Sequence, residues 1–329
     1  MKIIITIGDC NGIGIETMLK ALILFYKDGK NSDVKIDIIG RLDVIREYAD
    51  LIDFPLNIMD NSILVNGMEI AVLECKSEAD VYLGKVSKAA GELAAEAIEQ
   101  GVAMTVSGEY DALVTMPVSK YSLYMAGWTF PGHTEMLANT CGKDGRHLMM
   151  LFNDTMRVAL ATIHIPISQV SSLLTKELII DKLSLLNDSL TKDFSIEKPV
   201  IAVLGLNPHA GEDGAIGKEE QDIIMPAINE VNSQGIITKG PFPGDGFFAH
   251  NDYLNYDGIL AMYHDQGLIP LKLLAKGGGV NFTAGINIVR TSPDHGTAFS
   301  IAGQNIANPL SSLNALEYAV KISRNRFNL

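Results

Sequence analysis

The sequence predicts an α/β protein with a largely parallel or mixed sheet, organised in two domains. The first observation is an alternation in which apolar runs of strand length are followed by longer segments with apolar residues at helical spacing. The second is length, because 329 residues correspond to two domains at roughly 150 residues per domain. Ligand sites are then expected in the loops that follow the strands, since the carboxyl ends of parallel strands gather them.

The alternation begins at the amino terminus, where an apolar run over Lys2–Ile7 precedes a one-sided apolar stripe over Ile13–Tyr26. The same pattern predicts further strands over Val34–Ile39, Glu69–Leu73, Ala112–Thr115, Leu148–Phe152, Val158–Ile163, Val200–Leu204 and Gly258–Met262. It predicts further helices over Leu42–Tyr48, Val86–Gln100, Lys176–Leu190, Lys218–Val231 and Leu310–Arg324. No Pro-, Gly- or Ser-rich linker divides the chain, so we expect more than one crossover between the domains.

Composition excludes several classes of partner. Asp and Glu outnumber Lys and Arg by 39 to 26, a formal net charge of −13 that argues against nucleic acid or an anionic membrane. The net charge is still compatible with a local basic pocket that binds a small anion. The three cysteines are scattered and form no CxxC pair, so neither a disulfide framework nor a cysteine zinc site is expected. No apolar run approaches the ~20 residues of a membrane span, and we expect a cytoplasmic protein.

The histidines carry the strongest chemical signal. All seven lie beyond residue 132, and three of them, His164, His209 and His264, each end a strand-like run. Three neutral imidazoles gathered at one edge of a sheet are a typical donor set for a catalytic divalent metal ion. Their separation along the chain gives no ligand spacing, so a hydrogen-bonded place in a core or turn stays open for each.

Two carboxylates accompany these histidines. Asp265 directly follows His264 and is placed to orient an imidazole or to polarise a group bound to a metal. Asp245 lies in the turn-rich stretch 240–246, where simple turn chemistry is an equal alternative.

A further group of polar residues suits an anionic substrate. Lys272, Asn281 and Arg290 lie close together along the chain, and they combine a point charge, an oriented amide and the guanidinium fork that fits phosphate. Each of them could equally be solvated surface. His133 and Thr134 precede an expected helix, which Thr134 can cap, and both could equally reach into a cleft.

The loop Gly8–Gly14 follows the first expected strand and opens the first helix, where a phosphate-binding loop would lie. Its spacing is GxxxGxG, which differs from the GxGxxG of dinucleotide sites. A tight turn and a direct ligand contact are therefore equal interpretations.

Six stretches of the chain carry a family resemblance: Ile5–Asp9, Pro131–Glu135, Thr162–His164, Gly205–Glu212, Met262–Gly267 and Arg290–Ala298. In this order, and over nearly the whole chain, they resemble the 4-hydroxythreonine-4-phosphate dehydrogenase family of vitamin B6 biosynthesis. The resemblance implies two α/β/α domains flanking a cleft, similar to isocitrate and isopropylmalate dehydrogenases, and a homodimer. We expect about 1–125 plus 300–329 in the first domain, and about 126–299, with most metal and substrate residues, in the second.

The resemblance also implies roles for individual residues. The metal ligands are His164, His209 and His264, the last reaching the metal site of the partner subunit, and the catalytic carboxylates are Asp245 and Asp265. The substrate contacts are His133, Thr134, Lys272, Asn281 and Arg290, while no residue is assigned to the nicotinamide cofactor.

The activity implied is the oxidation of 4-phosphohydroxy-L-threonine, a small phosphorylated substrate, by NAD or NADP. The resulting β-keto acid loses carbon dioxide and gives 3-amino-2-oxopropyl phosphate. The divalent ion would be zinc, cobalt, magnesium, manganese or nickel. Where the family usually reads Gly-Asp-Pro-Ala-Gly-Ile-Gly-Pro-Glu, this chain has Cys10, Asn11 and Ile15 in place of the two prolines and the alanine, which leaves the role of that loop open.

Three alternatives remain at this point. The same machinery could act on another phosphorylated hydroxy acid, such as 4-phosphoerythronate or a phosphorylated threonate. A metal-dependent hydrolase or acyl transferase would need no nicotinamide. A noncatalytic metal-binding protein would not need Lys272, Asn281 and Arg290 together with the three histidines.

Overall fold

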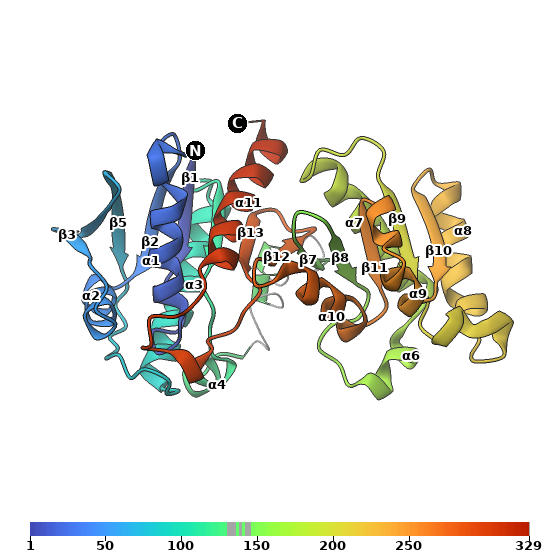
Figure 1. The fold of residues 1–329 in the computed structure, drawn as a ribbon, viewed down its shortest axis with the longest axis horizontal. Coiled ribbons are helices and arrows are strands. Elements are labelled where there is room, and N and C mark those ends of the chain that lie inside the picture. Colours follow the sequence, from blue (N-terminus) through green and yellow to red (C-terminus); the bar gives the residue numbers. More distant parts are fainter. Residues whose placement is uncertain (130–135, 138–139, 142–145, 329) are drawn as a thin grey trace. The chain divides into compact units, whose positions relative to one another are not determined.

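The computed structural model describes residues 1–129, 136–137, 140–141 and 146–328 and divides into two units (Figure 1). Unit 1 comprises Met1–Gly145 and Ile286–Leu329, and unit 2 comprises Arg146–Gly285, so the chain crosses between them twice. The limits lie at residues 145 and 285, whereas the sequence placed them near 125 and 299. Arg290 therefore belongs to unit 1.

Unit 1 is built on a mixed sheet. Its strands are β1 (Lys2–Thr6), β2 (Lys35–Gly40), β3 (Asn57–Met59), β4 (Ser62–Val65), β5 (Met68–Glu74), β6 (Ala112–Thr115) and β13 (Val289–Pro293). Neighbours in the order β13-β6-β1-β2-β5 are parallel, and β4 and β3 follow β5 as antiparallel strands. The apolar run of β1 is buried at Ile3, Ile4 and Ile5 alike, as in a strand covered on both faces.

The helices of unit 1 bury the two faces of this sheet. They are α1 (Gly14–Phe25), α2 (Leu42–Leu51), α3 (Lys88–Val106), α4 (Lys120–Met125) and α11 (Leu310–Phe327). Helix α3 packs against β1, β2 and β6, while α11 packs against β13, β6 and α1. Ser87 caps the amino terminus of α3, and its hydroxyl accepts a hydrogen bond from the Ala90 N–H at 3.1 Å, which satisfies one of the free donors of the first turn.

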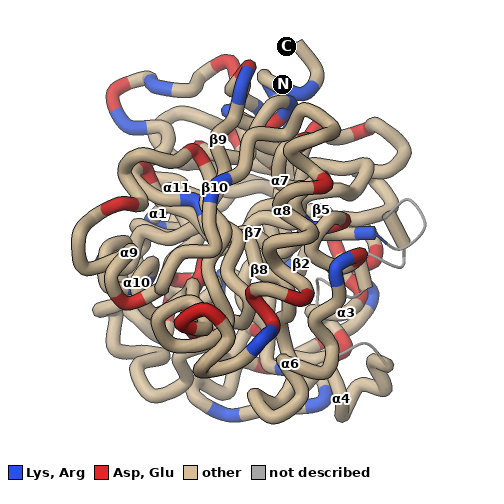
Figure 2. The backbone as a smooth tube through the Cα atoms, turned by 90° about the vertical axis from the view of Figure 1, so that its right-hand side faces the viewer, with Lys and Arg blue, Asp and Glu red and all other residues tan. Residues whose placement is uncertain are grey.

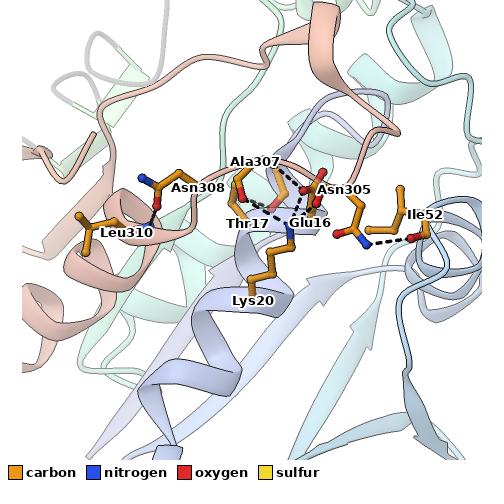
Figure 3. Close-up of polar contacts among 9 residues, drawn as sticks. Glu16, Thr17, Lys20, Ile52, Asn305, Ala307, Asn308 and Leu310 are labelled. Carbon is orange, nitrogen blue, oxygen red and sulfur yellow. Dashed lines mark hydrogen bonds and ion pairs between the residues drawn. The ribbon is translucent and has the colours of Figure 1, made fainter. Parts of the chain in front are cut away.

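Two loops of unit 1 are locked together where β1 and β13 end. The Ile13 N–H donates to the Thr297 carbonyl at 2.9 Å, and a Cβ on Gly12 would lie only 2.7 Å from that oxygen. Figure 3 shows the fully buried Glu16 carboxylate accepting from Lys20 Nζ and from the Ala307 N–H, each at 2.7 Å. The connection from β13 to α11 is thereby held against α1.

The loop Gly8–Gly14 has the geometry of a tight turn. Gly8 has a φ of +73°, and the Asp9 carboxylate accepts from the Asn11 N–H at 3.0 Å. Burial raises the pKa of Asp9, against the lowering effect of hydrogen bonds from Ser122 and from backbone amides. The turn therefore places a buried carboxyl group directly after β1.

Unit 2 also contains both parallel and antiparallel strands. Its strands are β7 (Leu148–Phe152), β8 (Arg157–Leu160), β9 (Val200–Leu204), β10 (Ile237–Phe242), β11 (Gly258–Ala261) and β12 (Val280–Ala284). In the order β10-β9-β11-β8-β7-β12, the first four strands are parallel and the last two pairings are antiparallel. The carboxyl ends of β9, β11 and β8 therefore share one edge of the sheet.

The helices of unit 2 are α6 (Val170–Leu173), α7 (Lys176–Lys192), α8 (Met225–Ser233), α9 (Gly244–Ala249) and α10 (His264–Ala275), and a single π-helical turn over Glu220–Ile224 leads into α8. Helix α10 packs against β7, β8 and β11, and α7 packs against the same sheet and against α8. A Cβ on Gly267 would lie 2.5 Å from Val158 Cγ1, so glycine lets α10 approach β8 closely.

The predicted α/β class is confirmed, and every strand and helix expected from the apolar pattern is present. The run that ends at His164 is a strand only as far as Leu160. The stretch 240–246, expected as a loop, forms the end of β10 and the start of α9, and it places Asp245 in the first turn of that helix. His264 is the first residue of α10 rather than the last of a strand.

Charged residues of both signs are interspersed along the chain, as the red and blue segments in Figure 2 show. Acidic residues exceed basic ones by 39 to 26. No helix within the described part of the chain is long and apolar enough to cross a membrane.

Candidate functional site

Three histidines follow three neighbouring strands of unit 2. His209 follows β9, His264 follows β11, and His164 follows β8, with β11 between the other two strands. The side chains of His164 and His209 are exposed, and that of His264 is partly buried. The three histidines therefore lie after strands that end at one edge of the sheet, because parallel strands end together there.

Two of these histidines line one pocket. His164 and His264 face a cavity of ≈ 430 Å³, with ring centroids 6.1 Å apart and ring planes at 42°. The Asp265 carboxylate lies 2.7 Å from His264 Nδ1, so the two groups share a hydrogen bond that fixes the orientation of the imidazole.

The third histidine lines a neighbouring pocket. His209 faces a cavity of ≈ 580 Å³ together with Asp245 and Asp265, and apolar residues from the second and third turns of α10 also line it. Tyr263 and Asp265 line both pockets. The structure thus groups His164 with His264, and His209 with Asp245, on two sides of residues 263–265.

The donor set fits a divalent cation in its chemistry, because neutral imidazoles supported by carboxylates suit zinc and its neighbours in the first transition row. Within one chain, however, no three His, Cys, Asp or Glu side chains of the described ranges come close enough to hold a metal ion.

Short polar contacts tie the three loops to one another. Thr162, two residues before His164, donates from Oγ1 to the Met262 carbonyl at 2.7 Å. Gln266, two residues after His264, accepts from the Met262 N–H at 2.7 Å and donates from Nε2 to the Gly205 carbonyl at 2.6 Å. The segment that carries each histidine is therefore hydrogen-bonded to the segment after the neighbouring strand.

The backbone that carries His209 is left-handed. Five consecutive residues, from His209 to Asp213, have φ between 43° and 82°, and only Gly211 among them is a glycine. Left-handed backbone costs an L-residue about 1–2 kcal/mol, and it normally occurs at single positions. Such a run persists only where surrounding contacts hold the backbone in place, and strained backbone of this kind clusters at functional sites.

The predicted substrate residues are distributed over both units. Lys272 is exposed on α10, about two helical turns after His264. Asn281 lies in β12, and its Oδ1 is buried without a hydrogen-bond partner among the described residues. Arg290 lies in unit 1, is 1% exposed, and donates from Nε and Nη2 to Thr115 Oγ1. His133 and Thr134 lie outside the described residues.

The sequence interpretation missed the residues that hold the loops: Thr162, Asn207, Glu220 and Gln266. Three of them lie within two positions of a singled-out histidine, so the neighbours of each histidine were a usable signal. Glu220 carried no such signal, because its contacts with residues 205–211 exist only once the chain has folded.

At the level of the fold, the chain is similar to the crystal structure of isocitrate dehydrogenase from Methylococcus capsulatus. The TM-score is 0.51 at 12% identity, covering 99% of this chain and 86% of that one. The fold is therefore of the isocitrate dehydrogenase class, as the sequence resemblance implied.

Closer similarities define the family. The model of the family described as "Pyridoxal phosphate biosynthetic protein PdxA" matches residues 33–319, and the chain belongs to this family. The 4-hydroxythreonine-4-phosphate dehydrogenase of Bacteroides thetaiotaomicron is 41% identical over 330 residues, covering 99% of this chain and 90% of that protein. The crystal structure of the enzyme of that name from Klebsiella pneumoniae gives a TM-score of 0.83 at 34% identity, covering 98% of this chain and 99% of that one.

Proposed function

We propose that this protein is a metal-dependent dehydrogenase that uses NAD or NADP to oxidise 4-phosphohydroxy-L-threonine in the biosynthesis of vitamin B6. The observation that carries the proposal is the placement of His164, His209 and His264 on cross-tied loops at one sheet edge, in a chain of this family. A purely structural role does not account for three histidines that are exposed or only partly buried at the ends of adjacent strands.

The reaction balances in two stages. The secondary alcohol loses a hydride and a proton and becomes a ketone. The bond between the neighbouring carbon and its carboxylate then breaks, carbon dioxide leaves, and that carbon takes up a proton to give 3-amino-2-oxopropyl phosphate. When bound, nicotinamide accepts the hydride, and a divalent cation lowers the pKa of the alcohol and stabilises the negative charge that develops.

The chain supplies ligands and orientation for this chemistry. His164, His209 and His264 would hold the cation, and Asp265 keeps the imidazole of His264 oriented through the 2.7 Å contact with Nδ1. Asp245 lines the same pocket as His209 and is placed to accept or return a proton there.

Substrate binding is assigned to His133, Thr134, Lys272, Asn281 and Arg290. The buried Oδ1 of Asn281 supports this assignment, because an unsatisfied buried acceptor destabilises the protein until a donor arrives. A substrate hydroxyl or ammonium group is such a donor. Lys272 and Arg290 would neutralise the phosphate, and this remote contact would position the reacting carbon.

We further propose a homodimer in which His264 reaches the metal site of the partner subunit. Helix α10 begins at His264 and carries two strongly exposed apolar side chains, Ile269 (57%) and Leu273 (73%). A second copy of the chain that covers this face would bury them and bring His264 with them. The absence of a closed three-ligand set among the described residues of one chain agrees with a shared site.

The proposed activity is tested by following NADH or NADPH formation with purified protein on a panel of phosphorylated hydroxy acids, before and after removal of metal. We expect reduction with 4-phosphohydroxy-L-threonine, loss of activity after chelation and recovery on adding a divalent cation. A preference for 4-phosphoerythronate or a phosphorylated threonate would change the substrate. Activity that survives complete metal removal would overturn the metal mechanism. If no substrate is oxidised and NAD and NADP give no thermal stabilisation, the protein is not a dehydrogenase.

The shared site is tested by complementation. His164→Ala and His264→Ala homodimers should both be inactive, whereas mixed dimers should regain activity because one of their two sites keeps all its ligands. Failure to regain activity in demonstrated mixed dimers would contradict the sharing of His264.

A further inference from the structure

We propose that Glu220 is a positioning residue that fixes His209 for the divalent cation. The inference deepens the proposed function and rests on it. Glu220 begins the π-helical turn before α8, lies eleven positions after His209, and is 4% exposed. It lines neither of the two pockets itself, so any effect on the site must pass through the residues that it holds.

The carboxylate of Glu220 is engaged by the segment that leads to His209. Its Oε1 accepts from the backbone N–H groups of Leu206 and Asn207 at 2.8 and 2.7 Å. Its Oε2 accepts from Asn207 Nδ2 at 2.9 Å. Three N–H donors thus compensate one buried negative charge, and all three belong to the two residues that precede Pro208 and His209.

The same carboxylate packs against the left-handed turn itself. A Cβ on Gly211 would lie 2.6 Å from Glu220 Oε2, and one on Gly205 would lie 3.1 Å from Oε1. Glu220 therefore occupies the inner side of the turn that runs from His209 to Asp213. Without it, the strained left-handed backbone loses the contacts that over-determine it and is expected to relax toward ordinary φ values.

The network continues to the loop of a second histidine. Asn207 Nδ2 also donates to Glu219 Oε2 at 2.8 Å, and Glu219 Oε1 accepts from the Ser171 hydroxyl at 2.5 Å. Ser171 lies in α6, the helix that follows the His164 loop. Glu219 and Glu220 together thus link the segments of His164 and His209, which fixes the spacing of two of the three proposed ligands.

The test compares Co²⁺ binding by four purified full-length dimers: wild type, Glu220→Met, Glu220→Gln and Glu230→Gln. Methionine removes every hydrogen bond, and glutamine keeps one acceptor oxygen at similar size. Glu230 is a matched control on the adjoining α8, where it is half exposed and pairs with Lys176 at the surface. Binding is read from the visible absorption of Co²⁺, which reports its coordination, and folding from circular dichroism and thermal unfolding.

We expect Glu220→Met to weaken Co²⁺ binding by about 10–100-fold and to alter its spectrum, because residues that support metal ligands have effects of this size. Glu220→Gln should recover part of the loss, and Glu230→Gln should match wild type. If Glu220→Met does not fold, Asn207→Ala takes its place, because it removes the side-chain contacts to both glutamates.

The outcomes separate the two proposals. Wild-type affinity and spectrum in a folded Glu220→Met or Asn207→Ala protein, while His209→Ala abolishes binding, would overturn the positioning role and leave the proposed metal site intact. Absence of histidine-dependent Co²⁺ binding in wild type would overturn the metal site, and the positioning role with it.

Discussion

Unit 1 and unit 2 each contain a buried glutamate that holds a loop after a parallel strand, and the two glutamates do different work. Glu16 in unit 1 is fully buried, accepts from the Ala307 N–H and pairs with Lys20 (Figure 3). Glu220 in unit 2 is compensated by backbone and amide N–H donors, and the turn that it holds presents an exposed histidine. Glu16 holds the connection between β13 and α11 against α1. Glu220 holds the turn at His209 in a strained conformation that leaves the histidine exposed.

The contrast shows that the carboxyl end of a parallel sheet is not by itself a site. In unit 1 the loops after β1 and β13 pack on each other so closely that Gly12 admits no side chain. In unit 2 the corresponding loops enclose pockets of ≈ 430 and ≈ 580 Å³ lined by histidine and aspartate. We therefore expect substitutions in the unit 1 loops to act mainly on stability, and those in the unit 2 loops mainly on ligand binding.

The largest expected effect is that of His209→Ala. Since partners of metal ligands alone typically contribute 10–100-fold, loss of a ligand should lower cation affinity and turnover by about 100-fold or more. The thermal midpoint should stay close to wild type, because the side chain is exposed. Metal titration and thermal unfolding measure the two effects. His250→Ala, a change at the exposed end of α9, is the control and should leave both unchanged. A large loss of stability in His209→Ala would break the comparison.

Lys20→Met should have the largest effect on stability in unit 1. It leaves the fully buried Glu16 carboxylate without its cation, and breaking a buried pair in this way costs about 3 kcal/mol. Denaturant unfolding measures the loss, and the folded variant should retain its cation affinity. Lys88→Met is the matched control, because Lys88 and Glu92 form an exposed pair worth less than about 1 kcal/mol. Equal losses in the free energy of unfolding for the two substitutions would show that the Glu16–Lys20 pair contributes no more than an exposed pair.

Gly12→Ala tests how tightly the unit 1 loops are packed. Its Cβ would meet the Thr297 carbonyl at 2.7 Å and the Thr297 Cβ at 2.9 Å, so we expect a loss of about 1–3 kcal/mol from overpacking. Gly296→Ala, one residue before Thr297, meets nothing within 4 Å and should change stability by less than about 1 kcal/mol. Equal stability of the two variants, measured by denaturant unfolding, would mean that the loops after β1 and β13 can move apart without loss of free energy of unfolding.

The same contrast explains what the sequence could predict. The central strands and the histidines that follow them could be predicted from the sequence, because apolar runs of strand length and the residues after them are local features. Helix α10 was not, since Gly267 and Pro270 weaken its helical signal and its packing on β8 and β11 compensates for them. The strands β3 and β10 lie at the ends of the strand order and are mostly exposed or half-buried, so their apolar pattern is weak.

The sequence singles out the histidines and carboxylates of the candidate site, but it does not predict their geometry. The sequence from His209 to Asp213 does not predict left-handed backbone, because four of the five residues carry a Cβ that disfavours it. The conformation follows from Glu220, which reaches the turn only through tertiary folding. Likewise, the sequence does not reveal that His209 and His164 line separate pockets within one chain.

The smallest expected effect concerns Cys10, which lies in the closed loop of unit 1 and is fully buried. Burial, reinforced by the negative charge of Asp9, raises the pKa of its thiol from 9.0 to about 12. As the pH rises above 9.0, the unfolded chain therefore loses this proton while the folded chain keeps it, and the free energy of unfolding falls. Cys10→Ala lacks this proton, so its stability should decline less than that of wild type between pH 8 and pH 10.

Denaturant unfolding at the two pH values measures this difference, and other groups that titrate in the range cancel because both proteins contain them. Thiol labelling at pH 8 provides an independent measurement. All three cysteines are buried, so the native protein should react slowly at each and the unfolded chain rapidly at all three. Rapid labelling of Cys10 in the native state, or parallel stability curves for the two proteins, would show that the loop after β1 opens to solvent. The loop after β1 would then not be closed to solvent, and the distinction between the closed loops of unit 1 and the accessible loops of unit 2 would be wrong.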